Sequence, residues 1–559
     1  MATAPAPASG TAASGQTASP PTVSLSIRLL REGREGEEAL RADHDLRRMP
    51  SETGELFIGQ NPPNPPGWVE FLSYFSPDLP ALLRTQSCAA VLFVEAAHDG
   101  EVRSFAISFG QGHHMLDDDA IERGFGLKVV LNTVARDRLR TLDSATLDST
   151  IMQRRVQASR NADLAAFEID TNRDLLRLAS GIPDGDAFAK ALAGKDALNL
   201  RAALAPGDLV PRCAKALEFY RGTEYRKDFA FIDHVIPVAD RVLLGTLDDL
   251  TFAALSDLVK GTPSDLHLAI PDILSPDHQL EIGYFGTGLS AGQKTPFLEV
   301  SIEDYVAELQ RGDFTSIKSM KDVRESHEIR VIVNGEGDRK QRQKLHRCLV
   351  FEARVANQTY VLFDGQWFLI ETGYHADVEQ AYQALLRPSI VQSTTSKNEQ
   401  QLIAALENQP GLLSIDRTKV SPTGAPGAAL EPCDFLTSGS QLIHLKDGHS
   451  SAPLSHLWNQ GLVSAEAFVR DAKFRNDFRA KARQREQQFN KTGFVLLLPT
   501  GAMKVVPTQF PFIFGVMRHP YAACGGLGLP FFSKVALRAV AERLGLMGFG
   551  VELHLIRKV

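Results

Sequence analysis

The feature that most constrains the fold is the succession of short apolar runs and helical patterns after residue 397. Strand patterns cover 412–418, 429–436, 441–446, 493–499 and 551–556, and helical patterns cover 398–409, 454–474 and 533–548. The run GFVLLLP (493–499) is apolar throughout, which is typical of a central strand buried on both faces. The pattern therefore predicts an α-β-β-β-α-β-α-β order around one sheet.

The chain of 559 residues is too long for a single ordinary core. We predict a multidomain α/β protein of the mixed α+β type, with a boundary in the polar segment 388–397. The first 22 residues are almost entirely Ala, Pro, Ser, Thr and Gly, which predicts a disordered tail. The predicted parts are a tail over 1–22, an N-terminal α/β domain over 23–200, a middle α+β domain over 201–395 and a C-terminal domain over 396–559.

Composition narrows the class of protein and of partner. A net charge of −7 excludes a polycation, so a nucleic-acid surface would have to be a local basic patch. The five cysteines include no C-x-x-C pair, which argues against a disulfide framework and a structural zinc site and favours the cytoplasm. No run approaches the ~18 apolar residues of a membrane span, so we expect no membrane partner.

Three chemically reactive side chains lie on two neighbouring strand patterns of the C-terminal domain. Asp434 lies in 429–436, and His444 and Lys446 lie in 441–446, where residues two apart share a face. Hydrolysis of a phosphodiester bond uses Mg²⁺ or Mn²⁺ held by hard oxygen ligands, together with a group that activates water. Asp434 is the expected metal ligand. His444 is expected to be a ligand or a base, and its imidazole suits Mn²⁺ better than Mg²⁺. Lys446 is expected to supply the ammonium group that acts on the attacking water. Glu431 is a further ligand if the strand departs from regular alternation.

Helix, three strands, helix, strand, with an acid on the second strand and acid-x-Lys on the third, resembles the restriction-endonuclease-like P-D-(D/E)-x-K nuclease superfamily. Asp434 matches the first acid, and His444 and Lys446 match the second element with histidine in place of the acid. Gln460 matches a glutamine of the following helix. The resemblance implies an αβββαβ core and a metal-dependent catalytic centre that contains these four residues. It also implies an acid on the first helix, for which the candidates are Glu399 and Glu407.

A basic helical pattern follows over 470–491, with eight Lys or Arg against three Asp or Glu. Such a helix beside a catalytic site is expected to follow a phosphate backbone. A solvated helix of mixed charge is the alternative. The residues predicted to bind nucleic acid are Lys473, Arg475, Arg479, Lys481 and Arg483.

Several phrases carry a wider resemblance: FGQGHH…IERGFGLKVVLN (109–132), YVLFDGQWFLIE (360–371), LEPCDFL…LIHLK…SSAPLSHLWNQG (430–461) and LPFFSKVALRAV (529–540). Over nearly all of 23–559 the chain is similar to a "sporadically distributed" bacterial family of unknown function. A patchy distribution is typical of mobile or defence-associated genes. The resemblance therefore implies a role in defence against phage or other foreign nucleic acid.

Three hypotheses remain open from the sequence. The first is a metal-dependent nuclease that hydrolyses phosphodiester bonds of foreign nucleic acid. The second is a degenerate nuclease fold that binds or senses nucleic acid or a phage protein in a defence complex. In the third the pattern arises by chance, with Asp434 capping a turn and Lys446 at a solvated strand end. The expected partners are nucleic acid, a protein of a defence complex, or further copies of the chain in a homo-oligomer.

Overall fold

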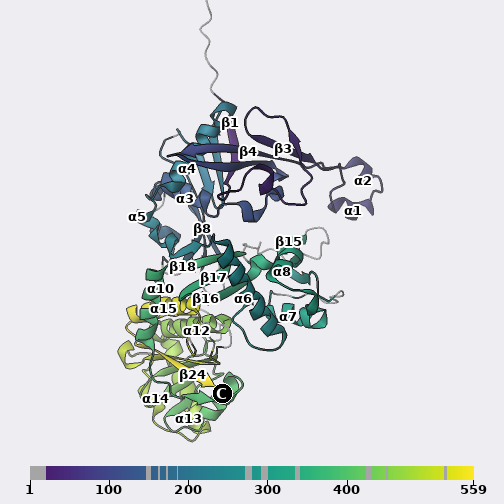
Figure 1. Ribbon diagram of the computed structural model, residues 1–559. Coiled ribbons are helices and arrows are strands. Elements are labelled where there is room, and N and C mark those ends of the chain that lie inside the picture. Colours follow the sequence, from purple (N-terminus) through teal and green to yellow (C-terminus); the bar gives the residue numbers. More distant parts are fainter. Residues whose placement is uncertain are drawn as a thin grey trace, which may run out of the picture. The chain divides into compact units, whose positions relative to one another are not determined.

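The computed structural model divides the chain into two compact units (Figure 1). Unit 1 comprises Met1–Leu142, Val156–Phe167 and Arg177–Asp228, and unit 2 comprises Asp143–Arg155, Glu168–Leu176 and Phe229–Val559. The predicted tail lies largely outside the described residues, and the predicted boundaries near 200 and 395 remain predictions. The structure describes residues 20–559 except 147–152, 162–163, 172–173, 186, 271–279, 291–296, 298–299, 334–339, 424–429, 449–450 and 521–525.

Most of a ten-stranded sheet belongs to unit 1, in the order β2-β3-β4-β5-β1-β10-β9-β8-β6-β7, while parts of β6, β7 and β8 fall in the segments assigned to unit 2. Its strands are β1 Thr22–Leu29, β2 Arg47–Met49, β3 Glu55–Gln60, β4 Cys88–His98, β5 Glu101–Gly110, β6 Leu139–Thr146, β7 Gln153–Gln157, β8 Asp174–Gly181, β9 Ala191–Gly194 and β10 Ala197–Ala203. The helices α3 Phe125–Thr133 and α4 Leu209–Arg221 pack together. The amide of Asn132 on α3 donates to the carbonyl of Phe219 on α4 at 2.7 Å.

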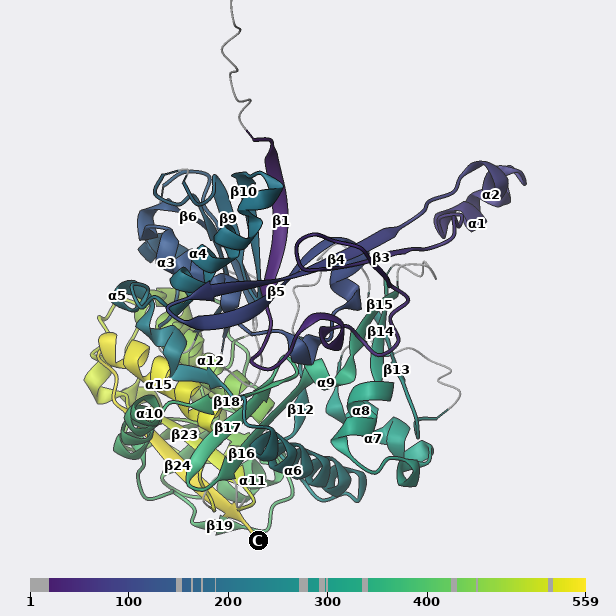
Figure 2. The same cartoon turned by 45° about the horizontal axis from the view of Figure 1, so that its top comes forward.

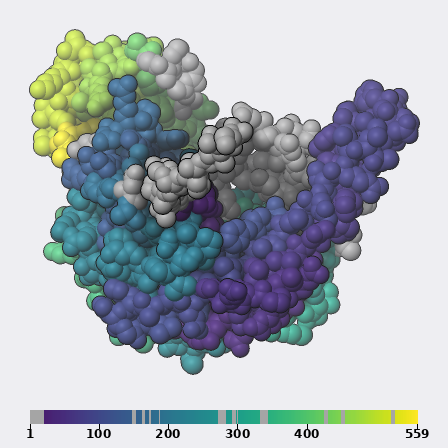
Figure 3. Space-filling model, turned by 90° about the horizontal axis from the view of Figure 1, so that it is seen from above, coloured from purple at the N-terminus to yellow at the C-terminus, as the bar shows by residue number. Residues whose placement is uncertain are grey.

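Residues 61–87 form a projection from unit 1, which we call the arm. The arm joins the end of β3 to the start of β4 and carries the short helices α1 Trp68–Ser73 and α2 Leu79–Leu82. Figure 2 shows α1 and α2 at the far end of the β3–β4 hairpin, away from the rest of the sheet of unit 1. In Figure 3 the arm is the indigo projection.

The first part of unit 2 contains two smaller antiparallel sheets. In the β11-β18-β17-β16-β12 sheet, the turn between β17 and β18 contains Asp364 and Gly365, whose positive φ angles (48° and 70°) are those of an Asp-Gly hairpin turn. The strands are β11 Val235–Pro237, β12 His267–Leu268, β13 Leu280–Phe285, β14 Glu328–Val333, β15 Lys340–Lys344, β16 Leu349–Val355, β17 Gln358–Phe363 and β18 Gln366–Ile370. The helices are α6 Arg241–Val259, α7 Ile302–Arg311, α8 Met320–Ser326, α9 Leu345–Cys348 and α10 Thr372–Leu385, and the short helix α5 Arg226–Phe229 spans the boundary with unit 1.

The last part of unit 2 is built on a six-stranded sheet in the order β19-β24-β23-β22-β21-β20. The strands β19, β24, β23 and β22 run parallel, and β22, β21 and β20 form an antiparallel meander. The strands are β19 Ser393–Thr394, β20 Leu412–Ser414, β21 Phe435–Thr437, β22 Leu442–Asp447, β23 Phe512–Arg518 and β24 Val551–Lys558. The helices are α11 Glu399–Leu406, α12 Ser451–Arg470, α13 Ala472–Gln488, α14 Phe494–Leu497 and α15 Phe531–Leu546.

Alternating residues along the strands of this sheet pack into two separate hydrophobic cores. Leu442, Phe512 and Phe514 pack with residues of α12, α13 and α15. Ile443 and Leu445, which alternate with Leu442 along β22, pack instead with residues of α11 on the other face. The sheet is therefore covered on both faces. Polar side chains can reach solvent at the ends of its strands, where loops join them.

The predicted succession holds from α11 to α12 and again from α15 to β24, but α13 and α14 lie between α12 and the fourth strand, which is a different segment from the predicted one. The prediction of a buried central strand over 493–499 is wrong, because the segment forms α14, a helical turn that starts after Gly493 in a left-handed conformation (φ 97°). The carboxylate of Glu486 accepts hydrogen bonds from the amides of Phe494 and Val495 at 2.7 and 3.1 Å. The central strand is β23, all of whose residues are buried. An apolar run alone does not distinguish a buried strand from a buried helical turn.

This assignment predicts a contrast between two apolar truncations. Phe514→Ala removes a fully buried ring of β23, which lies 5.0 Å from the Trp458 ring, centroid to centroid. We expect the free energy of unfolding to fall by about 3–5 kcal/mol. Leu496→Ala in α14, where the side chain is 85% exposed, is expected to change it by less than about 0.5 kcal/mol. Urea denaturation of both variants measures the difference, and equal effects would contradict the assignment.

Candidate metal centre

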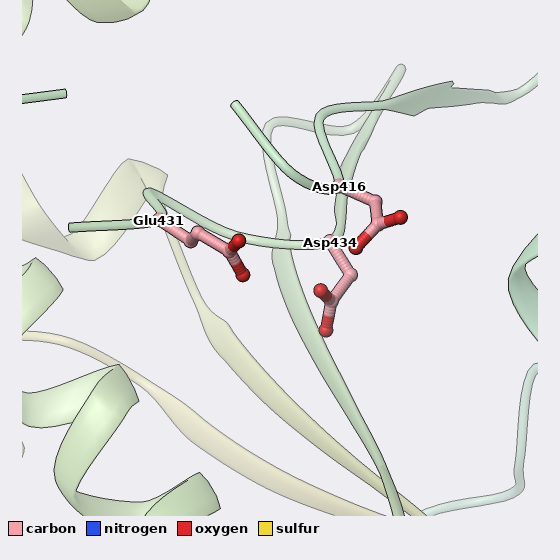
Figure 4. Close-up of side chains that lie close together, drawn as sticks. All are labelled: Asp416, Glu431 and Asp434. Carbon is pink, nitrogen blue, oxygen red and sulfur yellow. The ribbon is translucent and has the colours of Figure 1, made fainter. Parts of the chain in front are cut away.

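Three carboxylates converge at one edge of the six-stranded sheet. The nearest ligand oxygens of Asp416, Glu431 and Asp434 all lie within 4.8 Å of one another. Figure 4 shows Asp416 and Asp434 on adjacent segments of chain, with the Glu431 carboxylate directed towards them. Asp434 is 3% exposed, and Asp416 and Glu431 are partly exposed, so the group opens to solvent on one side. We call these three residues the carboxylate cluster.

Backbone pairing fixes Asp434 at the start of the meander. Its amide donates to the carbonyl of Ile443 at 2.8 Å, and its carbonyl accepts from the amides of Ile415 and Asp416 at 2.7 and 3.2 Å. The Asp434 carboxylate oxygen Oδ2 accepts a hydrogen bond from the amide of Leu445 at 2.6 Å. The strands on both sides therefore hold this residue, and the same pairing brings Asp416 beside it.

Glu431 joins the cluster because the segment before β21 is not a regular strand. The pairing of β21 with its neighbours begins only at Phe435, so the alternation that would have placed Glu431 on the opposite face does not apply. The helix α12 holds this segment in place. The hydroxyl of Ser464 donates to the carbonyl of Pro432 at 2.7 Å, and the Gln460 amide donates to the Glu431 carboxylate at 3.4 Å. Gln460 thus contacts a residue of the cluster.

The electrostatics of the cluster favour a bound cation or proton. Burial raises the pKa of Asp434 well above its usual value, and the negative charges of Glu399, Asp416 and Glu431 raise it further, against the hydrogen bond from Leu445. The pKa of Glu431 is also raised, first by burial and then by Asp416 and Glu399. Like charges in a buried site are relieved when a proton or a metal ion neutralises them. Carboxylate oxygens at this spacing are the ligand type that Mg²⁺ and Mn²⁺ take.

Lys446 and Glu399 form an ion pair whose charges act on the carboxylate cluster. The Lys446 ammonium lies 2.9 Å from a carboxylate oxygen of Glu399, the first residue of α11, and each side chain is about one quarter exposed (26% and 25%). The Lys446 charge lowers the pKa of Glu431 while that of Glu399 raises it, so both groups act on the cluster. Of the two candidate helix acids, Glu399 is therefore the one at the site. Glu407 instead accepts a hydrogen bond from the Ser414 hydroxyl at 3.2 Å.

His444 is not brought to the carboxylates, although the sequence predicts it as a ligand or base. Its side chain is fully buried, with the ring stacked on Phe512 (5.6 Å between centroids, 9° between planes) and tilted against Phe514 (6.1 Å, 35°). Neither ring nitrogen has a hydrogen-bond partner among the described residues. Burial lowers the pKa of His444 to about 3, so the ring is neutral near pH 7. His444 is kept away from the carboxylates because it lies on the same face of β22 as Leu442, and that face packs against α12.

The basic helix α13 offers fewer free cations than its sequence suggests. Arg475 is buried, and its guanidinium donates at 2.8–2.9 Å to backbone carbonyls at the end of α12 and in the loop after α14. Arg479 donates to two carbonyls in and just after α14. Lys473 lies 2.5 Å from an Asp477 oxygen. Lys481 is partly exposed and Arg483 is exposed. The two inner arginines hold the helix to its neighbours rather than face a phosphate backbone.

Asp416 is the site residue that the sequence did not single out. It lies at the end of the run LLSID, which the apolar pattern extends as a strand to residue 418. The strand β20 ends at Ser414, and the chain then turns so that the Asp416 side chain reaches the cluster. An acid that closes an apolar run at the edge of a predicted sheet was the available signal.

Comparison with known protein families gives one match, to the "Family of unknown function (DUF6119)", over residues 25–557. The chain belongs to the DUF6119 family. The cluster, Glu399, Lys446 and Gln460 of this DUF6119 chain all lie inside the matched range. No curated protein and no solved structure matches the chain. Across the part of the chain that the structure describes, no helix has the length and apolarity needed to cross a membrane.

Metal binding at the cluster predicts a stabilisation that depends on Asp434. With Mg²⁺ or Mn²⁺ at about 100 times its dissociation constant, the folded state should gain about 2.7 kcal/mol, seen as a rise in Tm. Asp434→Asn should abolish this rise, since it removes the buried ligand, whereas Asp477→Asn on α13 should keep it. Differential scanning calorimetry in EDTA and in added metal measures both. An undiminished rise in the Asp434→Asn variant would contradict binding at the cluster.

The buried imidazole predicts an acid-sensitive stability. Its folded-state pKa of about 3 lies below the unfolded value of about 6.5. The unfolded chain therefore binds the proton first, and the stabilising contribution, complete above about pH 6.5, is lost as pH falls towards 3. His444→Phe should lower the slope of unfolding free energy between pH 4 and 6 by up to about 1.4 kcal/mol per pH unit. An unchanged slope, measured by denaturant titration, would contradict this.

Proposed function

We propose that this DUF6119 chain is a metal-dependent nuclease that hydrolyses phosphodiester bonds, with the carboxylate cluster as its metal centre. The observation that carries the proposal is the convergence of the Asp416, Glu431 and Asp434 carboxylates within 4.8 Å. An ammonium, Lys446, lies at the same edge of the sheet with its own carboxylate partner. Acids that hold a metal beside a lysine suit attack of a metal-activated water on a phosphate ester.

The donor set fits Mg²⁺ or Mn²⁺. Carboxylates are hard oxygen ligands, and the partly exposed side of the cluster leaves room for water and a phosphate oxygen. The metal ion, when bound, lowers the pKa of a water ligand and neutralises charge on the phosphate. Asp434 is the anchoring ligand because the Leu445 amide fixes its second oxygen. Asp416 and Glu431 complete the set.

Lys446 interacts with the phosphate or the attacking water and is not a metal ligand. Its ammonium is held near the cluster by Glu399 at 2.9 Å and remains partly exposed, so it can donate to an attacking water or to a phosphate oxygen. Glu399 is a positioning residue that keeps the ammonium oriented. Gln460 is likewise a positioning residue, acting through its hydrogen bond to Glu431.

The topology supports the same proposal. The antiparallel β20–β22 meander, the parallel strand β23 and the helices α11 and α12 on opposite faces are compatible with the order that the restriction-endonuclease-like resemblance implies, with α13 and α14 inserted before β23. In that superfamily the acid of the second strand and the lysine of the third strand lie together. The patchy distribution of the family that the sequence resembles favours foreign nucleic acid as the substrate, in a defence role.

A second candidate is a protein that binds nucleic acid, or a phage protein, without cleaving it. The observation that favours it is His444, which stands where the superfamily carries an acid and which is buried among Phe512 and Phe514. In the nuclease proposal Asp416 and Glu431 supply the missing carboxylate. Cleavage therefore separates the two candidates.

A cleavage assay tests the nuclease directly. DNA and RNA, each single- and double-stranded, are incubated with Mg²⁺, with Mn²⁺ or with EDTA. Lys446→Ala should lower the metal-dependent rate by about 10²–10³-fold, the usual cost of removing one donor to a developing charge. Asp434→Asn should lower it at least as far, because it removes the anchoring metal ligand. His444→Phe should stay within a few-fold of the wild type at pH 7.5.

Lys321→Ala is the matched control for Lys446→Ala, because it removes an exposed lysine of α8 that is ion-paired with Glu325 and lies outside both the cluster and the basic helix α13. Metal-dependent cleavage that survives both Lys446→Ala and Asp434→Asn would contradict this assignment of the site. Salt-dependent nucleic-acid binding with no cleavage in any metal would select the second candidate.

A further inference from the structure

The arm of unit 1 carries an apolar face that no other described residue of unit 1 covers. Trp68, Phe71, Leu72 and Phe75 recur at the i, i+3, i+4 and i+7 positions, the spacing that in a surface helix normally faces a core. Here these side chains point outward, and Val69 on the other side of α1 is the buried one. The exposed fractions of the five most exposed apolar residues of the arm run from 54% to 88%: Trp68, Phe71, Tyr74, Phe75 and Leu82.

Hydrogen bonds and prolines hold the base of the arm. Asn64 and Thr85 exchange backbone hydrogen bonds of 3.0 and 2.9 Å, and Asn61 donates to both the carbonyl and the hydroxyl of Ser87 at 3.0 Å. The Gln86 amide donates to the Asn61 carbonyl at 3.0 Å. Six prolines between residues 62 and 80 restrict the backbone further. A preorganised projection presents its side chains with little ordering cost on association.

The area and the charge of the arm limit what can cover it. Leu72 and Leu83, each 36% exposed, add to the five residues above. With aromatic side chains of roughly 150–250 Å² each, these seven residues leave on the order of 800 Å² uncovered, about one partner's share of a standard interface. Only Glu70, Asp78 and Arg84 are charged between residues 61 and 87. Helices that bind bilayers carry Lys and Arg on their polar face, and nucleic acid requires cations. The arm therefore suits an equally apolar and uncharged protein surface.

We infer that the arm is a dimerisation element whose occupant is the arm of a second copy of this chain. Such a contact is isologous, because the same face is used on both copies and a two-fold axis closes it. Two faces of this size together bury about 1,600 Å², the size of a stable interface. Within the arm, the Phe71–Phe75 and Tyr74–Phe75 rings already pair edge to face, at 5.9 and 5.3 Å. The same geometry is available to rings of the partner copy.

Sedimentation equilibrium of the full-length chain tests dimerisation. The wild type should be dimeric at micromolar concentration, and Phe71→Asp with Phe75→Asp should raise the dimer dissociation constant at least about 100-fold, as loss of central interface aromatics does. Leu546→Asp is the matched control, since Leu546 on α15 is 89% exposed and lies outside the arm. It should leave the dimer intact. A wild type that is monomeric at about 100 µM, well above the dissociation constants of standard-size interfaces, or a double variant that remains dimeric, would overturn the inference.

A cross-linking experiment keeps the inference testable if the double variant folds poorly. In a Cys88→Ser background, which removes the exposed native cysteine beside the arm, single cysteines are placed along the arm as Phe71→Cys, Tyr74→Cys and Phe75→Cys, because a disulfide needs Cα atoms within about 7 Å of each other. At least one of the three should form an intermolecular disulfide on mild oxidation, and a cysteine at Leu546 should not. Absence of all three cross-links in a dimeric sample would place the contact elsewhere and overturn the inference. Pelleting of a monomeric wild type with phosphatidylcholine vesicles would make a bilayer the occupant and would equally overturn it.

Discussion

The hydrogen bond from the Leu445 amide to the Asp434 carboxylate is the contact on which the candidate centre depends. At 2.6 Å it fixes a buried acid against β22, and the carbonyl of Ile443 on the same strand accepts from the Asp434 amide. The carbonyl of Asp434 holds the turn that brings in Asp416. One residue, bonded through its amide, carbonyl and side chain, thereby sets the geometry of the cluster.

The surrounding sheet makes this arrangement tolerable. Burying acids of like charge lowers the stability of the folded state. The same unfavourable burial of charge raises the pKa values of Asp434 and Glu431. Two apolar cores, one on each face of the six-stranded sheet, offset it. A group of acids whose pKa values are shifted by burial and by one another is the arrangement on which the proposal of a functional site rests.

Sequence patterns predicted the succession from α11 to α12. They also singled out Asp434 and Glu431, whose carboxylates the structure brings together, and Lys446, whose charge acts on them. They failed where tertiary packing decides. Strand alternation cannot say which face of β22 is the aromatic core, so counting alone groups His444 with the acids. Asp416 comes to the cluster through a turn that local patterns do not specify. The apolar run at 493–499 forms a helical turn because the Glu486 carboxylate caps it.

The most direct test of the account is where a metal ion binds. Crystals soaked with Mn²⁺ give an anomalous signal that locates the ion independently of any activity. The account predicts a peak bonded to Asp434 and to oxygens of Asp416 and Glu431, at about 2.0–2.3 Å, and no peak at His444. A peak elsewhere in the chain, or none at the cluster at a saturating Mn²⁺ concentration, would contradict the central claim that these carboxylates form a metal centre.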